Sequence, residues 1–372
     1  MGRVERYMKN RSGLVSVTIV TYNSASFLVH CLNTVLAQDW PSLEVIVVDN
    51  ASTDQTARIL SRYQDRVHVI LNPDNRGFAG GQNQAIERAA GDWILVLNPD
   101  ALLTPEFVSC LVTSGNQDPA TGTVCGKLYR ALPDMNLPLI AELDSAGMFF
   151  TPTFRHFDRG MHETDGPQYS QPAYVFGATG AAALYRRTMI EDISFEGEFF
   201  DEDFFFSRED ADVSWRAQLL GWKCLYVPDA VGYHVRRVFP GVRKNLPALI
   251  NLHSVKNRFL MRLKNATPVL YLRNFIPVTV RDLGILLYCI MRERGSLQAF
   301  PLISKKLFRV LAKRRWIQQR RCVSESYLLL WFRFQPFTLP VPQSFSATIR
   351  PSTAHTPVPK ALVELPDAGR IR

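Results

Sequence analysis

Short apolar runs rich in β-branched residues alternate with stretches of helical period over the first hundred residues of the chain. The runs VSVTIV (15–20), VIVVD (45–49) and WILVLN (93–98) predict strands, and helices are predicted around 24–38 and 82–89. Strands that alternate with helices are typical of an α/β domain with a mostly parallel sheet. Because these runs are apolar almost throughout, we expect both faces of the sheet to be covered.

Each predicted strand ends in polar residues, namely Thr21 and Asn23 at the first, Asp49 at the second, and Asn98 and Asp100 at the last. Ligands of open α/β sheets bind beyond the carboxyl ends of the strands, so these residues should share one crevice. Mg²⁺ on a diphosphate is typically held by one or two carboxylates. The pattern indicates a nucleotide-sugar site, with Asp100 for the metal, Asn98 for the ribose and Asp49 for the base, although any one of them alone would fit a helix cap.

A glycine-rich segment, NRGFAGGQNQA (75–85), leads into a predicted helix. Glycines allow a ligand to approach the backbone closely, and a helix N-terminus next to Arg76 suits a diphosphate. The segment follows neither the GxGxxG pattern nor the phosphate-loop pattern, so taken alone it fits a plain turn as well.

Glu209, Asp210 and Asp212 open a predicted helix. A displacement at an anomeric carbon needs a base for the proton of the acceptor hydroxyl, and a carboxylate in a cleft can serve. One base is sufficient for a single displacement with inversion. The helix macrodipole also favours acids at this position without any catalytic role. Likewise, core packing explains the phenylalanines of FDEDFFF (200–206) as well as stacking on a sugar does. His234, after a strand-like run, would alone more often be a packed residue than a ligand.

The net charge of +9 is concentrated in one part of the chain, because residues 231–330 hold 20 Lys and Arg against 3 Asp and Glu, whereas all other residues hold 23 against 31. Within this part, the apolar segment 268–291 is interrupted by Arg273, Arg281 and Asp282. The stretches between these charged residues are therefore shorter than the roughly 20 apolar residues that a spanning helix needs. We expect helices that lie on an anionic membrane surface. A solvated helical cap is the alternative, and a nucleic-acid partner is not expected because no nucleic-acid-binding motif accompanies the charge.

Six cysteines lie far apart without a CxxC pair, which favours buried thiols in a reducing compartment. The N-terminal segment MGRVERYMKNRSG (1–13) is basic and lacks the apolar core of a secretory signal. These features lead us to expect a cytoplasmic protein, peripheral on the inner face of the plasma membrane.

The residues from about Val15 to Pro268 resemble the family 2 inverting glycosyltransferases of the GT-A fold, especially their bacterial rhamnosyltransferase-like branch. The resemblance rests on an ordered series of motifs: TIVTYNS (18–24), VIVVDNASTD (45–54), NRGFAGGQNQA (75–85), LVLNPDA (95–101), GATGAAALYRR (177–187), FDEDFFF (200–206), EDADVSWRAQLLGW (209–222) and the spaced His234. Together with the charge distribution and the Pro-rich composition of the last residues, it leads us to expect four parts: a basic N-terminal extension (1–13), a GT-A catalytic domain (14–244), a basic helical region (245–338) and a Pro-rich disordered tail (339–372).

The resemblance implies that Thr21, Asp49 and Asn75 line the nucleotide pocket, that Asp210 is the catalytic base, and that Asp100 and His234 are metal ligands. The ion would be Mg²⁺ or Mn²⁺, since an imidazole ligand is tolerated better by Mn²⁺. The donor would be a nucleotide diphosphate sugar, with dTDP-rhamnose expected from the branch alone. The acceptor would be a glycan or a lipid-linked saccharide in cell-surface polysaccharide synthesis.

Two departures from the family pattern stand out. Asn98 replaces the first acid of the DXD motif, which removes one charge from the metal site although this variant is usual in the branch. QLLGW (218–222) replaces the QxxRW of processive synthases, which suggests the addition of one or a few sugars. Three rivals remain: another nucleotide-hexose transferase of the family, a nucleotidyltransferase, and a catalytically silent membrane-associated scaffold that binds glycans. The nucleotidyltransferase would carry a basic glycine-rich loop where this chain has TYNSAS (21–26).

Overall fold

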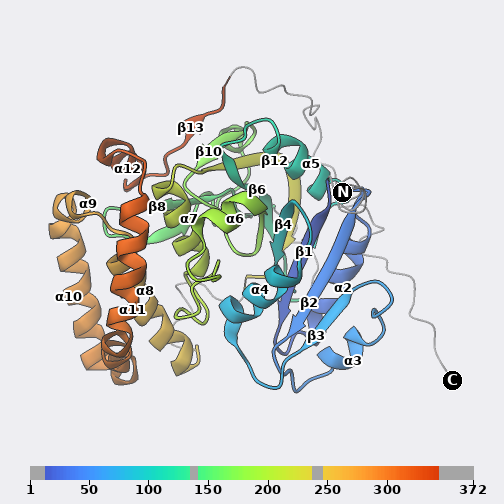
Figure 1. Cartoon of the computed structure of the whole chain (residues 1–372), viewed down its shortest axis with the longest axis horizontal. Helices are drawn as coiled ribbons and strands as arrows, with labels where there is room; N and C mark the ends of the chain where they lie inside the picture. The colour runs from blue at the N-terminus through green and yellow to red at the C-terminus, as the bar shows by residue number, and fades with distance from the viewer. Residues whose placement is uncertain (1–12, 135–140, 237–245, 343–372) are drawn as a thin grey trace, which may run out of the picture.

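The protein is described here by a computed structural model, which covers residues 13–134, 141–236 and 246–342 (Figure 1). Within these residues, eleven strands form one mixed sheet in the order β13-β10-β12-β6-β11-β4-β1-β2-β3, with β5 paired to β12 and β7 paired to β6. The strands of this sheet are β1 (Val15–Thr21), β2 (Leu43–Asp49), β3 (His68–Leu71), β4 (Trp93–Leu97), β5 (Ala101–Leu103), β6 (Thr121–Arg130), β7 (Leu143–Ser145), β10 (Ala173–Val175), β11 (Ala182–Arg186), β12 (Lys223–His234) and β13 (Leu339–Pro340).

The first four strands are parallel and fix the edge at which the polar residues gather. In the register of β1 and β2, Thr21 lies opposite Asp49, and in that of β1 and β4, Ile19 lies opposite Leu97. Because the strands run in the same direction, their carboxyl ends all lie along one edge of the sheet. The predicted α/β fold, with a mostly parallel sheet, a smaller antiparallel part and a helical C-terminal region, is confirmed.

Alternate residues of the central strands feed two separate cores. Val17 and Ile19 of β1 pack on one face, whereas Val20 belongs to the core of the other face. This arrangement explains the continuous apolar runs, since both faces of each strand are buried. The helices that belong to this α/β part are α2 (Ala25–Leu36), α3 (Thr56–Leu60), α4 (Gly77–Arg88), α5 (Phe107–Gly115), α6 (Arg187–Ile193) and α7 (Glu209–Leu219).

A helical region packs beside α7 and away from β1–β3 (Figure 1). Trp215 of α7 joins its core together with Leu260, Ile317 and Phe332. The region contains α8 (Ala248–Asn265), α9 (Pro268–Arg273), α10 (Phe275–Arg292), a short 3-10 helix η3 (Arg294–Gln298), α11 (Ala299–Arg320) and α12 (Glu325–Trp331). The described residues also form a small hairpin of β8 (Met148–Phe150) and β9 (His156–Asp158) and the turn η1 (Pro167–Tyr169). In the described part of the chain, no helix combines the length and the apolar character needed to cross a membrane.

The C-terminal boundary differs from the sequence prediction. The tail predicted to be disordered from Leu339 begins inside the sheet, because Leu339 and Pro340 form β13 and pair with β10. A proline is tolerated there because β13 lies at the end of the strand order, where one side of the strand needs no partner. Residues 1–12, the predicted boundary at 244 and 245, and residues 343–372 lie outside the described part.

Candidate active site

At the end of β2 lies a buried carboxylate that accepts hydrogen bonds from neighbouring residues. Asp49 is 3% exposed, and its Oδ1 accepts hydrogen bonds from Thr21 Oγ1 at 2.8 Å and from Ser52 Oγ at 2.5 Å. The Ser52 amide donates to Asp49 Oδ2 at 3.2 Å. Thr21 comes from the neighbouring strand, so the parallel register itself brings this pair together.

The loops after β1 and β2 are joined through Asn23. Its backbone is left-handed, with φ of 51°, a conformation that asparagine tolerates better than most residues. Asn23 Oδ1 accepts from the Thr53 amide at 2.8 Å, and the Asn23 amide donates to Ser52 Oγ at 2.9 Å. These bonds fix the two strand-end loops against each other, as expected for residues that border one crevice.

The glycine-rich segment forms the start of α4. Asn75 Oδ1 accepts from the Gly77 amide at 2.8 Å, and the Ala79 amide donates to the Phe205 carbonyl at 3.1 Å. Gly77 has φ of +71°, and a Cβ at this position would lie 2.4 Å from the Phe205 oxygen, so only glycine fits. Two amides of this helix end are therefore already used within the chain. The side chain of Arg76, next to this helix end, is exposed.

Asp100 and His234 meet at the end of the parallel strands. In the antiparallel pairing of β12 with β5, His234 lies opposite Ala101, which places the imidazole next to Asp100. His234 Nε2 lies 3.4 Å from Asp100 Oδ1 and 3.5 Å from Asn98 Nδ2. Both Asp100 and His234 are buried.

The other imidazole nitrogen of His234 is held by a carboxylate. His234 Nδ1 lies 2.8 Å from Asp144 Oδ2, and Arg236 donates to Asp144 Oδ1 at 2.6 Å and lies 2.7 Å from Asp158. Burial lowers the pKa of His234, but Asp144 and Asp100 outweigh it and raise the pKa to about 9. Burial alone would raise the pKa of Asp144, yet His234 and Arg236 hold it well below its ordinary value.

This donor set fits a divalent ion. A histidine that binds a metal commonly has its second ring nitrogen bonded to a carboxylate, as Nδ1 of His234 has with Asp144, and the Asp100 carboxylate faces Nε2. In the part of the chain that the structure describes, no group of three or more His, Cys, Asp and Glu is arranged to hold a metal. Asp100 and His234 would supply two ligands, and phosphate oxygens of a bound substrate could supply others.

The three acids at the start of α7 have three different environments. Asp210 is partly exposed, Glu209 is buried with Oε2 unpartnered among the described residues, and Asp212 forms an ion pair with Arg216 at 2.9 Å. The Asp210 oxygens accept from the amides of Gly180 at 3.0 Å and Ala211 at 2.7 Å. Burial of the carboxyl raises the pKa of Asp210. The hydrogen bonds from the two amides lower this pKa but do not cancel the effect of burial.

Asp210 and the metal-site residues border the same loop. The Gly180 amide binds Asp210, and the Ala181 carbonyl one residue later accepts from the Asn98 amide at 2.9 Å. Arg236, which is bound to Asp144 behind His234, also lowers the pKa of Asp210 through its charge. These contacts link Asp210 to the loop that is bonded to Asn98, two residues before Asp100.

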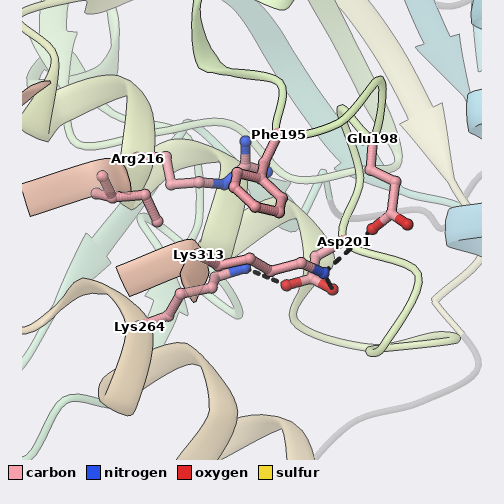
Figure 2. Close-up of a pocket in the computed structure, with 7 residues that line it drawn as sticks. Phe195, Glu198, Asp201, Arg216, Lys264 and Lys313 are labelled. Carbon is pink, nitrogen blue, oxygen red and sulfur yellow. Dashed lines mark hydrogen bonds and ion pairs between the residues drawn. The ribbon is translucent and has the colours of Figure 1, made fainter. Parts of the chain in front are cut away.

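The segment FDEDFFF is fastened to the C-terminal helices by buried ion pairs. Asp201 forms ion pairs with Lys264 of α8 and, at 2.6 Å, with Lys313 of α11, and Lys264 also binds Asp212 at 2.8 Å. Figure 2 shows Lys264, Lys313 and Asp201 converging around a cavity of about 10 Å³, which has no room for a sugar. Because Phe200 and Phe204 are fully buried, core packing explains them. The basic helices are therefore part of the same folded unit as α7.

Sequence reasoning did not find Asp144, Arg236, Asp158 or Arg208. Arg236 could have been found, since it follows His234 by two residues in HVRR. Asp144 comes from a short strand in a stretch of irregular pattern, and its role depends on the pairing of β7 with β6, which no local pattern reports.

Part of the chain is similar to known proteins. Residues 16–194 match the family described as "Glycosyl transferase family 2". Among curated relatives, TuaG of Bacillus subtilis (strain 168), a glycosyltransferase named for teichuronic acid biosynthesis, is 38% identical over 25% of this chain. The succinoglycan biosynthesis protein ExoO of Rhizobium meliloti (strain 1021) is 38% identical over 36% of it. Each match spans 38% of the relative's own length, so the chain aligns with well under half of either protein.

Two solved structures have a similar fold. GalNAc-T7 with UDP, GalNAc and Mn²⁺ gives a TM-score of 0.55 at 16% identity and covers 85% of this chain and 56% of that one. S. aureus TarS 1–349 with UDP-GlcNAc gives a TM-score of 0.51 at 17% identity and covers 82% of this chain and 88% of that one. Residues 16–194 are thus similar to the family 2 glycosyltransferases, and the fold is GT-A. The family match ends at residue 194, before Asp210 and His234.

Proposed function

We propose that this chain is a metal-dependent inverting hexosyltransferase. It would move a sugar from a nucleotide diphosphate donor to the hydroxyl of a glycan or lipid-linked acceptor during synthesis of a cell-surface polysaccharide. The observation that carries the proposal is the meeting of Asp100 with His234 at 3.4 Å, close to a loop that also holds Asp210. The match to a glycosyltransferase domain supports the reaction class.

The donor lies across the strand ends in this proposal. Asp49, with its oxygens held by Thr21 and Ser52, accepts hydrogen bonds from the base, while Asn98 binds ribose hydroxyls. Asn23 and Asn75 hold the loops on either side, and the exposed Arg76 reaches the diphosphate. A buried carboxylate with fixed donors is a rigid acceptor, which favours recognition of a single base orientation.

Asp100 and His234 would hold Mg²⁺ or Mn²⁺, and Asp144 would keep the His234 imidazole oriented toward the ion. When bound, the ion stabilises the negative charge that develops on the departing diphosphate. Behind the site, Arg236 forms ion pairs with both Asp144 and Asp158 and neutralises part of their negative charge.

Asp210 acts as the base on the acceptor side. Its carboxylate is aimed by the amides of Gly180 and Ala211, and its raised pKa makes it a stronger proton acceptor than an ordinary aspartate. It takes the proton of the acceptor hydroxyl as that oxygen attacks the anomeric carbon from the face opposite the diphosphate. The new glycosidic linkage therefore has the inverted configuration.

The sugar itself is the least constrained part of the proposal. We propose dTDP-rhamnose on the resemblance of the motifs alone. The names of the relatives refer to teichuronic acid and succinoglycan, and TarS was solved with UDP-GlcNAc. Another nucleotide-hexose is therefore the first alternative, and a catalytically silent glycan-binding scaffold is the second.

We also propose that the protein is peripheral on the inner face of the plasma membrane. On α10, Ile276, Val280, Leu283 and Leu287 are more than half exposed and follow a spacing of four, three and four residues. They form one apolar stripe on the outer face of the helix. Burial of such a stripe in an anionic leaflet, next to basic residues, would anchor the acceptor side of the enzyme.

Release of nucleotide diphosphate from a panel of nucleotide sugars tests the proposal. One nucleotide sugar should be hydrolysed slowly with Mn²⁺ or Mg²⁺ and not with EDTA, and the His234→Ala variant should lose that release. A scaffold would release no nucleotide with any donor. Release that is insensitive to EDTA would contradict the metal-dependent reaction.

A further inference from the structure

A cluster of arginines lies where the start of α7 meets the helical region. Arg208 precedes α7, Arg258 lies on α8, Arg281 lies on α10, and Arg155 follows β8. Arg208 donates to the Ser254 carbonyl at 3.2 Å, and Arg281 donates to Thr153 Oγ1 at 3.0 Å, so both bonds end on neutral acceptors. In the described part of the chain, no carboxylate forms an ion pair with Arg155, Arg258 or Arg281.

Arg258 is the most exceptional member of this cluster. Its Nη1 is buried and has no hydrogen-bond partner among the described residues. Asp282, which is close in sequence to Arg281, is instead paired with Arg262 at 2.5 Å. Burial, followed by the charges of Arg208 and Arg281, lowers the pKa of Arg258 to about 8. A buried guanidinium nitrogen without a partner is costly, and buried charges ordinarily have an anionic partner.

A cavity of about 230 Å³ lies at this cluster, between α8 and α10. Its lining consists of Ser254, Val255, Arg258, Gly284, Ile285 and Tyr288. Arg258 is the arginine of this lining; Arg281 lies one helical turn before Ile285, and Arg208 is bonded to Ser254. The volume is sufficient for a phosphate or diphosphate group.

The mouth of the cavity adjoins the apolar stripe of α10. Gly284 lines the cavity and is itself exposed, and its neighbour Leu283 is 60% exposed. A ligand that fits both surfaces has an anionic head and an aliphatic chain. A nucleic acid is a poorer fit, because bases stack on aromatic side chains and the stripe is aliphatic.

We propose that the arginine cavity binds the phosphate or diphosphate head of a lipid-linked acceptor whose chain lies along α10. This inference rests on the proposed function, because the acceptor hydroxyl must reach Asp210. Arg208 supplies the connection, since it is bonded to Ser254 of the cavity lining and precedes Asp210 by two residues. Guanidinium groups suit this role because they bind phosphate oxygens through paired, charge-assisted hydrogen bonds.

Two glycines give a matched pair of variants. A Cβ at Gly284 or at Gly295 would meet no atom within 4 Å, so leucine can be introduced at either position without a clash at Cβ. Gly284→Leu should fill the mouth of the cavity, whereas Gly295→Leu lies in η3, outside the cavity lining. Arg258→Met removes the buried charge and should raise the melting temperature, since methionine needs no partner there.

Binding of farnesyl diphosphate, measured by calorimetry on the full chain, tests the inference. The unmodified protein and Gly295→Leu should bind it, and Gly284→Leu and Arg258→Met should bind it at least tenfold more weakly. Pyrophosphate should bind more weakly than farnesyl diphosphate, because it lacks the chain. Equal binding of farnesyl diphosphate by all four proteins, or equal affinity for pyrophosphate, would overturn the inference.

Two further readouts separate the possible sources of phosphate and the two proposals. Binding of the protein to phosphatidylglycerol vesicles is the first readout. If this binding depends on Arg258 while farnesyl diphosphate does not bind, the cavity takes a membrane phospholipid and the inference is wrong. Hydrolysis of the nucleotide sugar should be unchanged in Gly284→Leu and Arg258→Met. If the unmodified protein binds farnesyl diphosphate but hydrolyses no nucleotide sugar, the proposed function is wrong and the cavity assignment stands.

Discussion

Asp100 and His234 lie 3.4 Å apart because β12 pairs with the short strand β5 that follows Asp100. The two residues are distant in sequence, and neither has this geometry without the pairing of those strands. Their contact is the part of the site that makes a metal-dependent transfer chemically reasonable. It also depends on Asp144, which holds the opposite nitrogen of the imidazole.

Asp144→Asn should weaken metal binding without removing a ligand. Loss of the negative charge weakens the bond that orients His234 and lowers the basicity of its imidazole, and changes of this kind typically cost about tenfold to a hundredfold in affinity. Titration with Mn²⁺ followed by electron paramagnetic resonance measures the change. Asp118→Asn, which breaks an ion pair with Lys223 elsewhere in the chain, is the control and should bind Mn²⁺ as the unmodified protein does.

Glu209 should make the stability of the protein depend on pH. Burial, reinforced by Asp210, raises its pKa from 4.5 to about 8, so the folded state keeps a proton that the unfolded state releases. Its stabilising contribution is present below pH 4.5 and is lost as the pH rises to about 8, with a slope on the order of 1 kcal/mol per pH unit. Glu209→Gln should remove this slope in urea denaturation at several pH values. An unchanged slope would show that Glu209 is ionised in the fold.

Lys264→Met should destabilise the whole molecule. The change leaves Asp201 and Asp212 without one of their buried cationic partners, and breaking a buried pair in this way costs roughly 3–5 kcal/mol. Denaturant unfolding measures the loss. Lys305→Met, at an exposed position of α11, should change stability by less than about 0.5 kcal/mol. If both variants unfold alike, the helical region is not fastened to α7 by these ion pairs.

The double change of Leu283→Ser and Leu287→Ser should weaken membrane binding. Full burial of one leucine contributes about 1.5–3 kcal/mol, so the pair should lower affinity for anionic vesicles by more than about tenfold. Cosedimentation with vesicles measures the effect. Leu71→Ser, at an exposed position of β3, is the matched control. Binding that survives the double change would assign the contact to another surface.

The sequence was most informative where local pattern decides structure. The parallel strands and their polar ends follow from continuous apolar runs, and Asp49, Asp100, His234 and Asp210 were all named from sequence. Sequence did not reveal that the amides at the start of α4 are already bonded, because their partner, the Phe205 carbonyl, is distant in sequence. The same reason hid Asp144 and the cluster around Arg258, which exist only once separate strands and helices are packed together.

The number of charged residues in the C-terminal part follows from the sequence, but the burial of some of them in ion pairs does not. Lys264 and Lys313 point inward to Asp201 and Asp212, so part of the predicted surface charge is structural. Composition counts charges and does not distinguish a buried lysine from an exposed one. The outward apolar stripe of α10, by contrast, follows directly from helical spacing.

The central claim is that Asp210 takes the acceptor proton beside a donor held at the strand ends. Donor binding and sugar transfer, measured together in Asp210→Asn, test it most directly. The amide keeps the shape of the side chain, so the nucleotide sugar should bind with unchanged affinity while transfer falls by at least about a thousandfold. Transfer at the rate of the unmodified protein would contradict the claim.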